Sequence, residues 1–233
     1  MSKRFFLTQI LLLLLSHGAF SQNIDLLITY NNDSSEIISV PDDITRIYNF
    51  KKDLIVYRED EVVIRHQHRP IKSLSDLAHF QNLEIADLVY TFDSCTSLDF
   101  LKSSVIEKLD ISWGVSNINL DFVKSMIYLK ALRLNHIENI NLEDIDLSNT
   151  KIEYLQISDC NISSIGNFTF NDSLKYIHFG YNKDISFTSQ FISELNNRGV
   201  TLISDKKPEG IENFIQTYSS GVIVYGKYGM SEM

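Results

Sequence analysis

The sequence predicts an α/β solenoid, with short parallel strands stacked along a concave face and helical or irregular segments returning along a convex side. Three observations predict this fold. Apolar hexapeptides recur at nearly constant spacing between residues 83 and 185, two further strand-like segments follow in phase, and β-like segments precede them. Recurrence of one segment at a period of about 20–50 residues is typical of stacked structural units.

Five hexapeptides carry the repeat, each with apolar residues at its first, fourth and sixth positions. They are Ile85-Leu88-Tyr90, Ile106-Leu109-Ile111, Leu129-Leu132-Leu134, Ile152-Leu155-Ile157 and Leu174-Ile177-Phe179. Their successive starts are 21, 23, 23 and 22 residues apart. One apolar hexapeptide is common by chance, but five at this spacing indicate a repeat.

These units resemble the leucine-rich repeat family, and the fourth and fifth match it best. The resemblance implies a short parallel strand and a return segment in each unit. The family prefers Asn or Cys at the ninth position, where a buried polar side chain bonds the loop backbone. That position holds Asp93, Gly114, Ile137, Cys160 and Asn182 here, so two of five fit and the subfamily stays unassigned.

The segments after residue 185 predict a strand–helix–strand closure of the stack. Strands are expected around Val200 and Val222, which are 22 residues apart. A helix is expected over 187–196, with Phe191, Ile192 and Leu195 toward the core, and another over 208–218. Such a closure is needed because an uncapped last repeat exposes its apolar face.

Three β-like segments before the repeat predict an amino-terminal β cap over residues 22–68. They cover 44–50, 54–57 and 62–67, with a hairpin turn at 58–61. A separate small domain is the alternative. The repeats and their closure take residues 69–233, and 73–80 is expected to form the first convex turn.

The amino terminus has the pattern of a signal peptide, predicted over residues 1–21. Lys3 and Arg4 precede a short apolar segment, and small residues stand at Ala19 and Ser21 before a cleavage site. A membrane anchor is the alternative. Cleavage would leave a mature chain without a membrane span that is secreted, periplasmic or at the cell surface. Removing the two basic residues changes the formal charge from −9 to −11, which disfavours nucleic acid.

The repeat predicts which side chains form the concave surface, because side chains alternate along a strand. Asp110 should pair with Arg133, Phe92 should form a row with Trp113 and His136, and Tyr154 should lie beside Tyr176. The alternative is that these rings lie over one another or under the cap. The predicted binding residues are Phe92, Asp110, Trp113, Arg133, Asn135, His136, Tyr154, Gln156, Tyr176, His178 and Tyr181.

The sequence contains no nucleophile, phosphate-loop or dinucleotide motif and no metal signature, so catalytic residues, metals and cofactors are all predicted to be absent. Asp110 and Asp159 could form a carboxylate pair, but they lie two strands apart, and an open sheet is not expected to shift a carboxyl pKa. Cys95 and Cys160 are expected about 14 Å apart, which is too far for a disulfide, so both are predicted to be buried free thiols.

Exposed aromatic rings beside Arg, Asn and Gln favour a recognition surface. The sequence therefore predicts a binding protein that engages a protein or peptide on its concave sheet. A glycan-binding protein and a structural or adhesive envelope protein are the alternatives, and an enzyme is disfavoured.

Overall fold

The computed structural model describes twelve stretches of the chain. These are residues 22–50, 53–67, 71–75, 77–89, 98–102, 104–113, 119–138, 140, 142, 145–165, 168–182 and 185–217. The described chain is α/β, with many strands and few helices. The first six strands are β1 (Asn23–Tyr30), β2 (Ser35–Pro41), β3 (Arg46–Phe50), β4 (Asp53–Arg58), β5 (Glu61–Gln67) and β6 (Ile71–Ser75).

The remaining elements alternate strands with short return segments. They are η1 (Leu77–His79), β7 (Ile85–Val89), η2 (Asp99–Leu101), β8 (Lys108–Ser112), η3 (Val123–Ser125), β9 (Ala131–Asn135), β10 (Ile145–Asp146), β11 (Tyr154–Ser158), β12 (Phe168–Thr169), β13 (Tyr176–His178), α2 (Ser189–Arg198), β14 (Thr201–Ser204) and β15 (Phe214–Gln216). The η elements are single turns of 3-10 helix.

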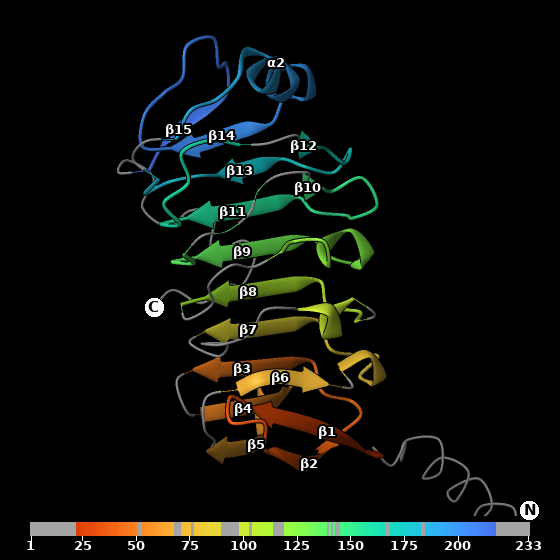
Figure 1. Cartoon of the computed structure of the whole chain (residues 1–233). Helices are drawn as coiled ribbons and strands as arrows, with labels where there is room; N and C mark the ends of the chain where they lie inside the picture. The colour runs from red at the N-terminus through yellow and green to blue at the C-terminus, as the bar shows by residue number, and fades with distance from the viewer. Residues whose placement is uncertain are drawn as a thin grey trace, which may run out of the picture.

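Most strands belong to one sheet in the order β15-β14-β13-β11-β9-β8-β7-β3-β4-β5. From β3 through β7 to β15 the neighbours are parallel, and Figure 1 shows them stacked like rungs. Ile85 pairs with Lys108, which pairs with Ala131, then Tyr154 and Tyr176. A constant interval of 22 or 23 residues therefore places one strand directly on the next.

The strand pairing corrects the register predicted for the first unit. Leu88 pairs with Ile111 and Ala86 with Leu109, so the hexapeptide begins at Leu83 rather than at Ile85. Leu83, Ala86 and Leu88 are fully buried. Ala86 is a small residue and was not recognised as the fourth apolar position of the unit. Tyr90 was instead taken as the sixth apolar position of a hexapeptide that starts at Ile85. Asp87, Leu88 and Val89 keep the sides assigned to them, but Ile85, expected to point inward, pairs with Lys108 at an outward position.

The three β-like segments predicted before the repeat are confirmed as β3, β4 and β5. β4 and β5 form the predicted hairpin, with Glu59 in the left-handed region at its turn. β1 pairs with β2 and β6 in a second, antiparallel sheet. Residues 73–75, expected to start the first convex turn, are instead the end of β6, in which Ile71 and Leu74 are fully buried.

The closure differs from its prediction after β14. The helix predicted over 187–196 is confirmed as α2, and Phe191, Ile192 and Leu195 are its buried residues. The helix predicted over 208–218 is wrong: Gly210 makes a turn with φ 81°, and β15 follows it. The edge of β14 provides backbone partners for β15, which overrides helical spacing. The strand predicted at Val222 lies outside the described residues.

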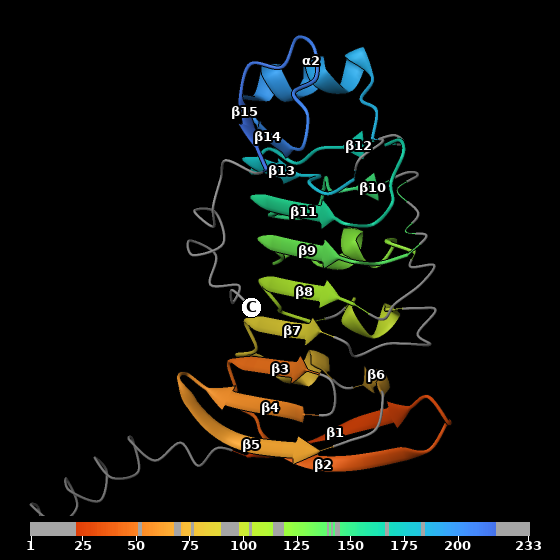
Figure 2. The same ribbon diagram turned by 90° about the vertical axis from the view of Figure 1, so that its left-hand side faces the viewer.

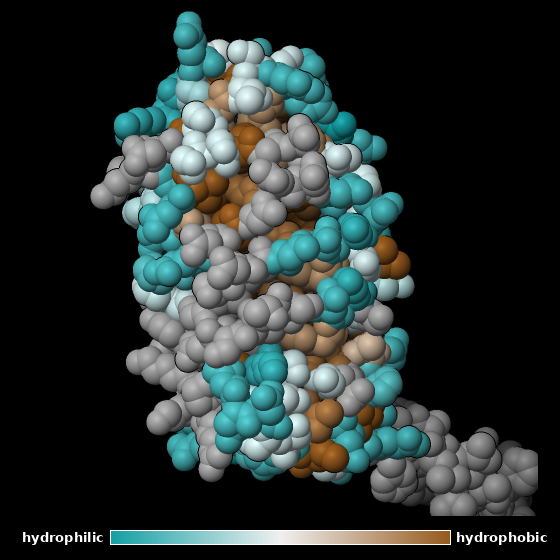
Figure 3. All heavy atoms as spheres, viewed as in Figure 1, coloured by the Kyte–Doolittle hydropathy of each residue, from teal (hydrophilic) through white to brown (hydrophobic). Residues whose placement is uncertain are grey.

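A single apolar core runs from Leu26 in β1 to Ile211 beyond β14. In Figure 2 the short helices, β10 and β12 lie on one side of the stacked strands β7 to β11, and the core fills the space between them. Figure 3 shows apolar residues between polar ones along the outside of the stack. Among the described residues, no helix is long and apolar enough to cross a membrane.

Candidate functional site

The side of the large sheet away from the core carries a row of polar side chains. Pairing brings Asp87, Asp110, Arg133, Gln156 and His178 to matching positions on β7, β8, β9, β11 and β13. Neighbouring strands lie about 4.8 Å apart, so each of these side chains stands next to the following one. We call the side of the sheet that bears this row the strand face.

Charges on the strand face occur in pairs. Asp87 accepts a hydrogen bond from Arg46 of β3, and Asp110 accepts one from Arg133 at 3.1 Å. Ser112 also donates to Asp110. The predicted pairing of Asp110 with Arg133 is confirmed.

Asp110 is only 4% exposed, and burial raises the pKa of its carboxyl to about 6 although Arg133 and Ser112 oppose the shift. Burial raises the pKa of Asp87 as well, against the opposing charge of Arg46. The expectation that carboxyl pKa values stay unshifted on this sheet is therefore wrong. The expectation assumed an open, wet surface, but these two carboxylates are removed from water.

A chain of hydrogen bonds runs along β11 and on to β9. Tyr154 Oη donates to Gln156 Oε1 at 2.9 Å, and Gln156 Nε2 donates to Ser158 Oγ at 2.6 Å. Ser158 Oγ then donates to Asn135 Oδ1 at 2.9 Å. The three β11 residues are two apart in sequence, so their side chains share one face and reach one another. This satisfied network fixes their orientation.

Tyr154 and His178 form the less polar part of the strand face. Tyr154 is 1% exposed, packs with Ala131 and lies beside Tyr176, as predicted. Its hydroxyl is 3.3 Å from His178 Nδ1. Burial, with the charge of Arg133 adding to it, lowers the pKa of His178 to about 4. The imidazole is therefore neutral at neutral pH and can take part in hydrogen bonds without adding charge.

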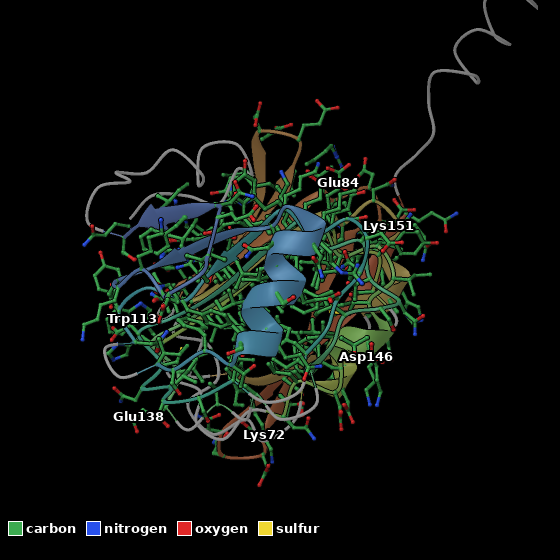
Figure 4. The ribbon with its side chains drawn as sticks, turned by 90° about the horizontal axis from the view of Figure 1, so that it is seen from above. Lys72, Glu84, Trp113, Glu138, Asp146 and Lys151 are labelled. Atoms are coloured by element: carbon green, nitrogen blue, oxygen red, sulfur yellow. The ribbon has the colours of Figure 1, made fainter. Side chains whose placement is uncertain are left out.

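Four residues form a second row, which we call the end row. Trp113, His136 and Asp159 directly follow β8, β9 and β11, and Tyr181 comes three residues after β13. All four have positive φ, between 54° and 62°. The rings of Trp113 and His136 stack with centroids 3.7 Å apart, and His136 Nδ1 is 2.7 Å from Asp159 Oδ2. His136, Asp159 and Tyr181 are 44–49% exposed. Figure 4 shows Trp113 on the opposite side of the stack from Asp146 and Lys151.

The structure therefore divides the predicted binding residues into two groups. Six lie on the strand face with Asn135 beside them in the network, and three belong to the end row. The strand-face group is Asp110, Arg133, Asn135, Tyr154, Gln156, Tyr176 and His178; the end-row group is Trp113, His136 and Tyr181. The stack of Trp113 on His136 is confirmed, whereas Phe92 lies outside the described residues.

The predicted binding residues did not include Arg46, Asp87, Ser112 or Ser158, although the repeat had assigned Asp87, Ser112 and Ser158 to the concave surface. Placing the first unit at Leu83 aligns Asp87 with Asp110 and would have identified it as a member of the same row. Ser112 and Ser158 occupy the position that Asn135 holds in the third unit, and only Asn135 was selected from that position. Arg46 carried no repeat signal, because β3 precedes the recognisable units.

Few groups in the described part of the chain suit metal or thiol chemistry. No cluster of three or more His, Cys, Asp or Glu side chains with metal-binding geometry occurs there. Cys160 is a buried free thiol, and burial raises its pKa to about 11, so it is not a ready nucleophile. Cys95 lies outside the described residues.

Comparison with known proteins found no matching family model, no matching curated protein and no matching solved structure. The strand face and the end row must therefore be interpreted from their own geometry.

Proposed function

We propose that the chain is a degenerate leucine-rich-repeat solenoid. The constant interval between paired parallel strands supports this, and so does Asn182 at the ninth position of the fifth unit. Asn182 Nδ2 donates to the carbonyls of Ile157 and Phe179, and its Oδ1 accepts from the backbone of Cys160. That is the bonding expected of the family's polar ninth residue. Cys160, at the same position one unit earlier, is also buried.

We propose that this solenoid binds a protein or peptide partner on the strand face. The observation that carries the proposal is the polar row from Asp87 to His178, whose paired charges and hydrogen bonds hold Arg133, its most exposed side chain, in a fixed position. Side chains held in fixed positions lose little entropy on binding, which favours specific recognition. Tyr176, which is partly exposed next to buried Tyr154, adds aromatic surface beside the polar row.

The test is capture of partners from the native envelope by the mature protein and by a double variant, Trp113→Ala with Tyr176→Ala. Both rings lie on or beside the strand face, and partners bound there should be enriched at least tenfold less by the variant, a loss of about 1.4 kcal/mol. The dissociation constant of each captured partner is then measured by titration with the purified protein.

The matched control is Tyr128→Ala with Lys151→Ala. Lys151 lies 5.4 Å from the ring of Tyr128, and this pair is placed on the opposite side of the stack from Trp113. The control should bind partners as the unaltered chain does. Equal binding by the strand-face variant and the unaltered chain would contradict the proposal.

A glycan is the second candidate, and the end row favours it. The Trp113 ring stacks on His136, polar atoms of His136 and Asp159 lie next to that stack, and Tyr181 is exposed further along. Sugars stack on such rings while their hydroxyls bond to neighbouring polar groups. A glycan array should then show binding that Trp113→Ala abolishes and Tyr176→Ala retains. A peptide partner would depend on Tyr176.

The proposed setting is outside the cytoplasm. Its support is the basic and apolar pattern of residues 1–21, which lie outside the described residues. Sequencing the amino terminus of the exported protein should find Gln22 first, and an intact Met1 would contradict the proposal. The absence of catalytic activity stays a prediction.

A further inference from the structure

β2 forms a free edge at the amino-terminal end of the stack (Figure 1). Among the described strands it pairs only with β1, in an antiparallel register that runs over seven residue pairs without a bulge. Most of β2 is exposed, and Ile37 is 62% exposed, which is the largest value for a described large apolar side chain. A regular strand with a free edge is a template on which another strand can pair.

The backbone groups that β2 leaves for another strand can be assigned from two hydrogen bonds. Asp42 N–H donates to the carbonyl of Gln22 beyond one end of the β1–β2 pair, and Tyr30 N–H donates to that of Ser34 at the other end. Along an antiparallel strand, successive residues turn their N–H and C=O groups to opposite sides. Even-numbered residues of β2 therefore bond to β1, and odd-numbered ones face the free edge. Those with both groups at the free edge are Ser35, Ile37 and Ser39.

The remaining edge strands of the described sheets have features that hinder pairing. β5 has one extra residue opposite the step from Val56 to Tyr57 of β4, and β6 has one opposite the step from Thr29 to Tyr30 of β1. Bulges of this kind twist an edge away from a partner strand, and short edges offer it few hydrogen bonds. β10, β12 and β15 have only two or three residues each. β2 is therefore the described edge that is least protected against an added strand.

The charge around β2 indicates which kind of strand it would accept. Residues 22–45 contain no Lys or Arg and five acidic residues, which are Asp25, Asp33, Glu36, Asp42 and Asp43. Two of the five pair with basic residues of other segments, whereas Asp25 is exposed and forms no ion pair with a described residue. A second copy of this chain would bring the same carboxylates to the edge, where like charges on neighbouring strands repel. A basic strand would be attracted.

Pairing within the small sheet shows where the side chains of an added strand would lie. Directly opposed side chains share one side of a sheet, and on the outer side Asp25 is opposite Ser39. A basic side chain next to Ser39 can pass over this small residue to Asp25, and an apolar side chain next to Ile37 would cover it. On the other side of the sheet, a second basic side chain would meet Glu36, whose side chain is 45% exposed.

We propose that β2 binds a basic, extended segment of another protein as an added antiparallel strand. Backbone hydrogen bonds at Ile37 and Ser39 supply the affinity, and the positions of the basic and apolar side chains supply the specificity. The added strand would turn the sheet of β2, β1 and β6 into a four-stranded one. This edge is separate from the strand face and the end row, so the inference goes beyond the proposed function and does not depend on it.

The probe is a capped, fluorescein-labelled hexapeptide, VKVIKT, added to the full mature chain. In antiparallel register its first lysine lies next to Ser39, its isoleucine next to Ile37 and its second lysine next to Glu36. Fluorescence anisotropy should give a dissociation constant about tenfold lower than for the acidic hexapeptide VEVIET. Amide hydrogen exchange should slow about tenfold at Ile37 and Ser39 when VKVIKT is bound, whereas Ile38, whose N–H already bonds to β1, should change little.

Two variants test the backbone and the charge separately. Ser39→Pro removes an outward N–H, and proline is tolerated on a strand edge where that group faces solvent. It should weaken binding of VKVIKT about tenfold while far-ultraviolet circular dichroism stays unchanged. Asp25→Asn, which retains the backbone of β2, should weaken binding of VKVIKT about threefold without weakening that of VEVIET. The control is Tyr128→Ala, an exposed position before β9, which should bind as the unaltered chain does.

Equal affinity for VKVIKT and VEVIET would overturn the assignment of a basic partner. Bound VKVIKT without slower exchange at Ile37 and Ser39 would overturn the site. Mature chains that form dimers, which Ser39→Pro dissociates, would make a second copy the occupant and so overturn the proposal. Absence of VKVIKT binding at about 1 mM would overturn it as well.

Discussion

At the scale of single residues, buried polar groups determine both the stability of this chain and the character of its candidate site. Asn182 is 1% exposed and joins two turns of the stack through four backbone groups. Asp110 and His178 are ionisable groups that are buried on the stacked strands of the same sheet. Each can be tested by one substitution.

Asn182→Ala should lower the free energy of unfolding by about 2–4 kcal/mol. The substitution leaves the carbonyl of Ile157 and the N–H of Cys160 buried without their partner, and each such loss costs about 1–3 kcal/mol. Urea unfolding followed by circular dichroism measures it. Asn197→Ala, on the exposed side of α2, is the control and should change stability by less than about 0.5 kcal/mol. Equal effects of the two variants would reject the role assigned to Asn182.

Asp110 and His178 should shift the pH dependence of stability in opposite directions. The pKa of Asp110 is raised from 3.8 to about 6, so its stabilising contribution is complete below pH 3.8 and is lost as the pH rises to about 6. The pKa of His178 is lowered from 6.5 to about 4, so its contribution is complete above pH 6.5 and is lost as the pH falls to about 4.

Single variants separate the two contributions. Between pH 7 and pH 4, Asp110→Asn should lose about 1–3 kcal/mol of unfolding free energy relative to the unaltered chain, and His178→Gln should gain a similar amount. Chemical denaturation at each pH measures both. Curves that run parallel to that of the unaltered chain over this range would show that neither group has a shifted pKa.

At the scale of elements, α2 is the helix whose limits are best explained. Thr188 caps its first turn by accepting a hydrogen bond from the backbone of Phe191, and Gly199 ends it in the left-handed conformation. Three buried apolar residues on one side hold it against the end of the stack.

Thr188→Ala should destabilise the chain by about 0.5–2 kcal/mol, because it removes the side-chain acceptor at the start of α2. Ser189→Ala, one residue later, makes no such bond and should be close to neutral. Thermal unfolding compares the two variants. A larger loss in Ser189→Ala than in Thr188→Ala would mean that the helix starts elsewhere.

The elements also show how far the sequence could be interpreted. The strands of the five repeat units, the three strands β3, β4 and β5, and α2 were predictable, because apolar side chains at strand or helix spacing must face a core. The helix predicted at 208–218 failed although Ile211, Phe214 and Ile215 fit helical spacing. The edge of β14, which no local sequence pattern indicates, instead pairs with residues 214–216 as a strand. The burial of Asp110 could not be predicted for a similar reason. Alternation along a strand indicates on which side of the sheet a side chain lies, but not how far its neighbours bury it.

At the scale of the whole molecule, one apolar core joins the amino-terminal strands to the closing helix. The described part of the chain should therefore unfold in a single step. Leu26→Ala in β1 and Leu195→Ala in α2, which both create cavities, should shift the same transition by about 2–5 kcal/mol each. Trp113 fluorescence and far-ultraviolet circular dichroism should report the same midpoint. Two separate transitions would instead identify the amino-terminal strands as an independent domain.

The left-handed backbone of the end row has a consequence for engineering. A non-glycine residue in that region costs about 1–2 kcal/mol, and Trp113, His136, Asp159 and Tyr181 all adopt it. Glycine at position 113 would relieve that strain, so a search for thermostable variants would favour losing the ring that stacks on His136. Optimising this protein for heat resistance alone would thus tend to erase one of its two candidate recognition surfaces.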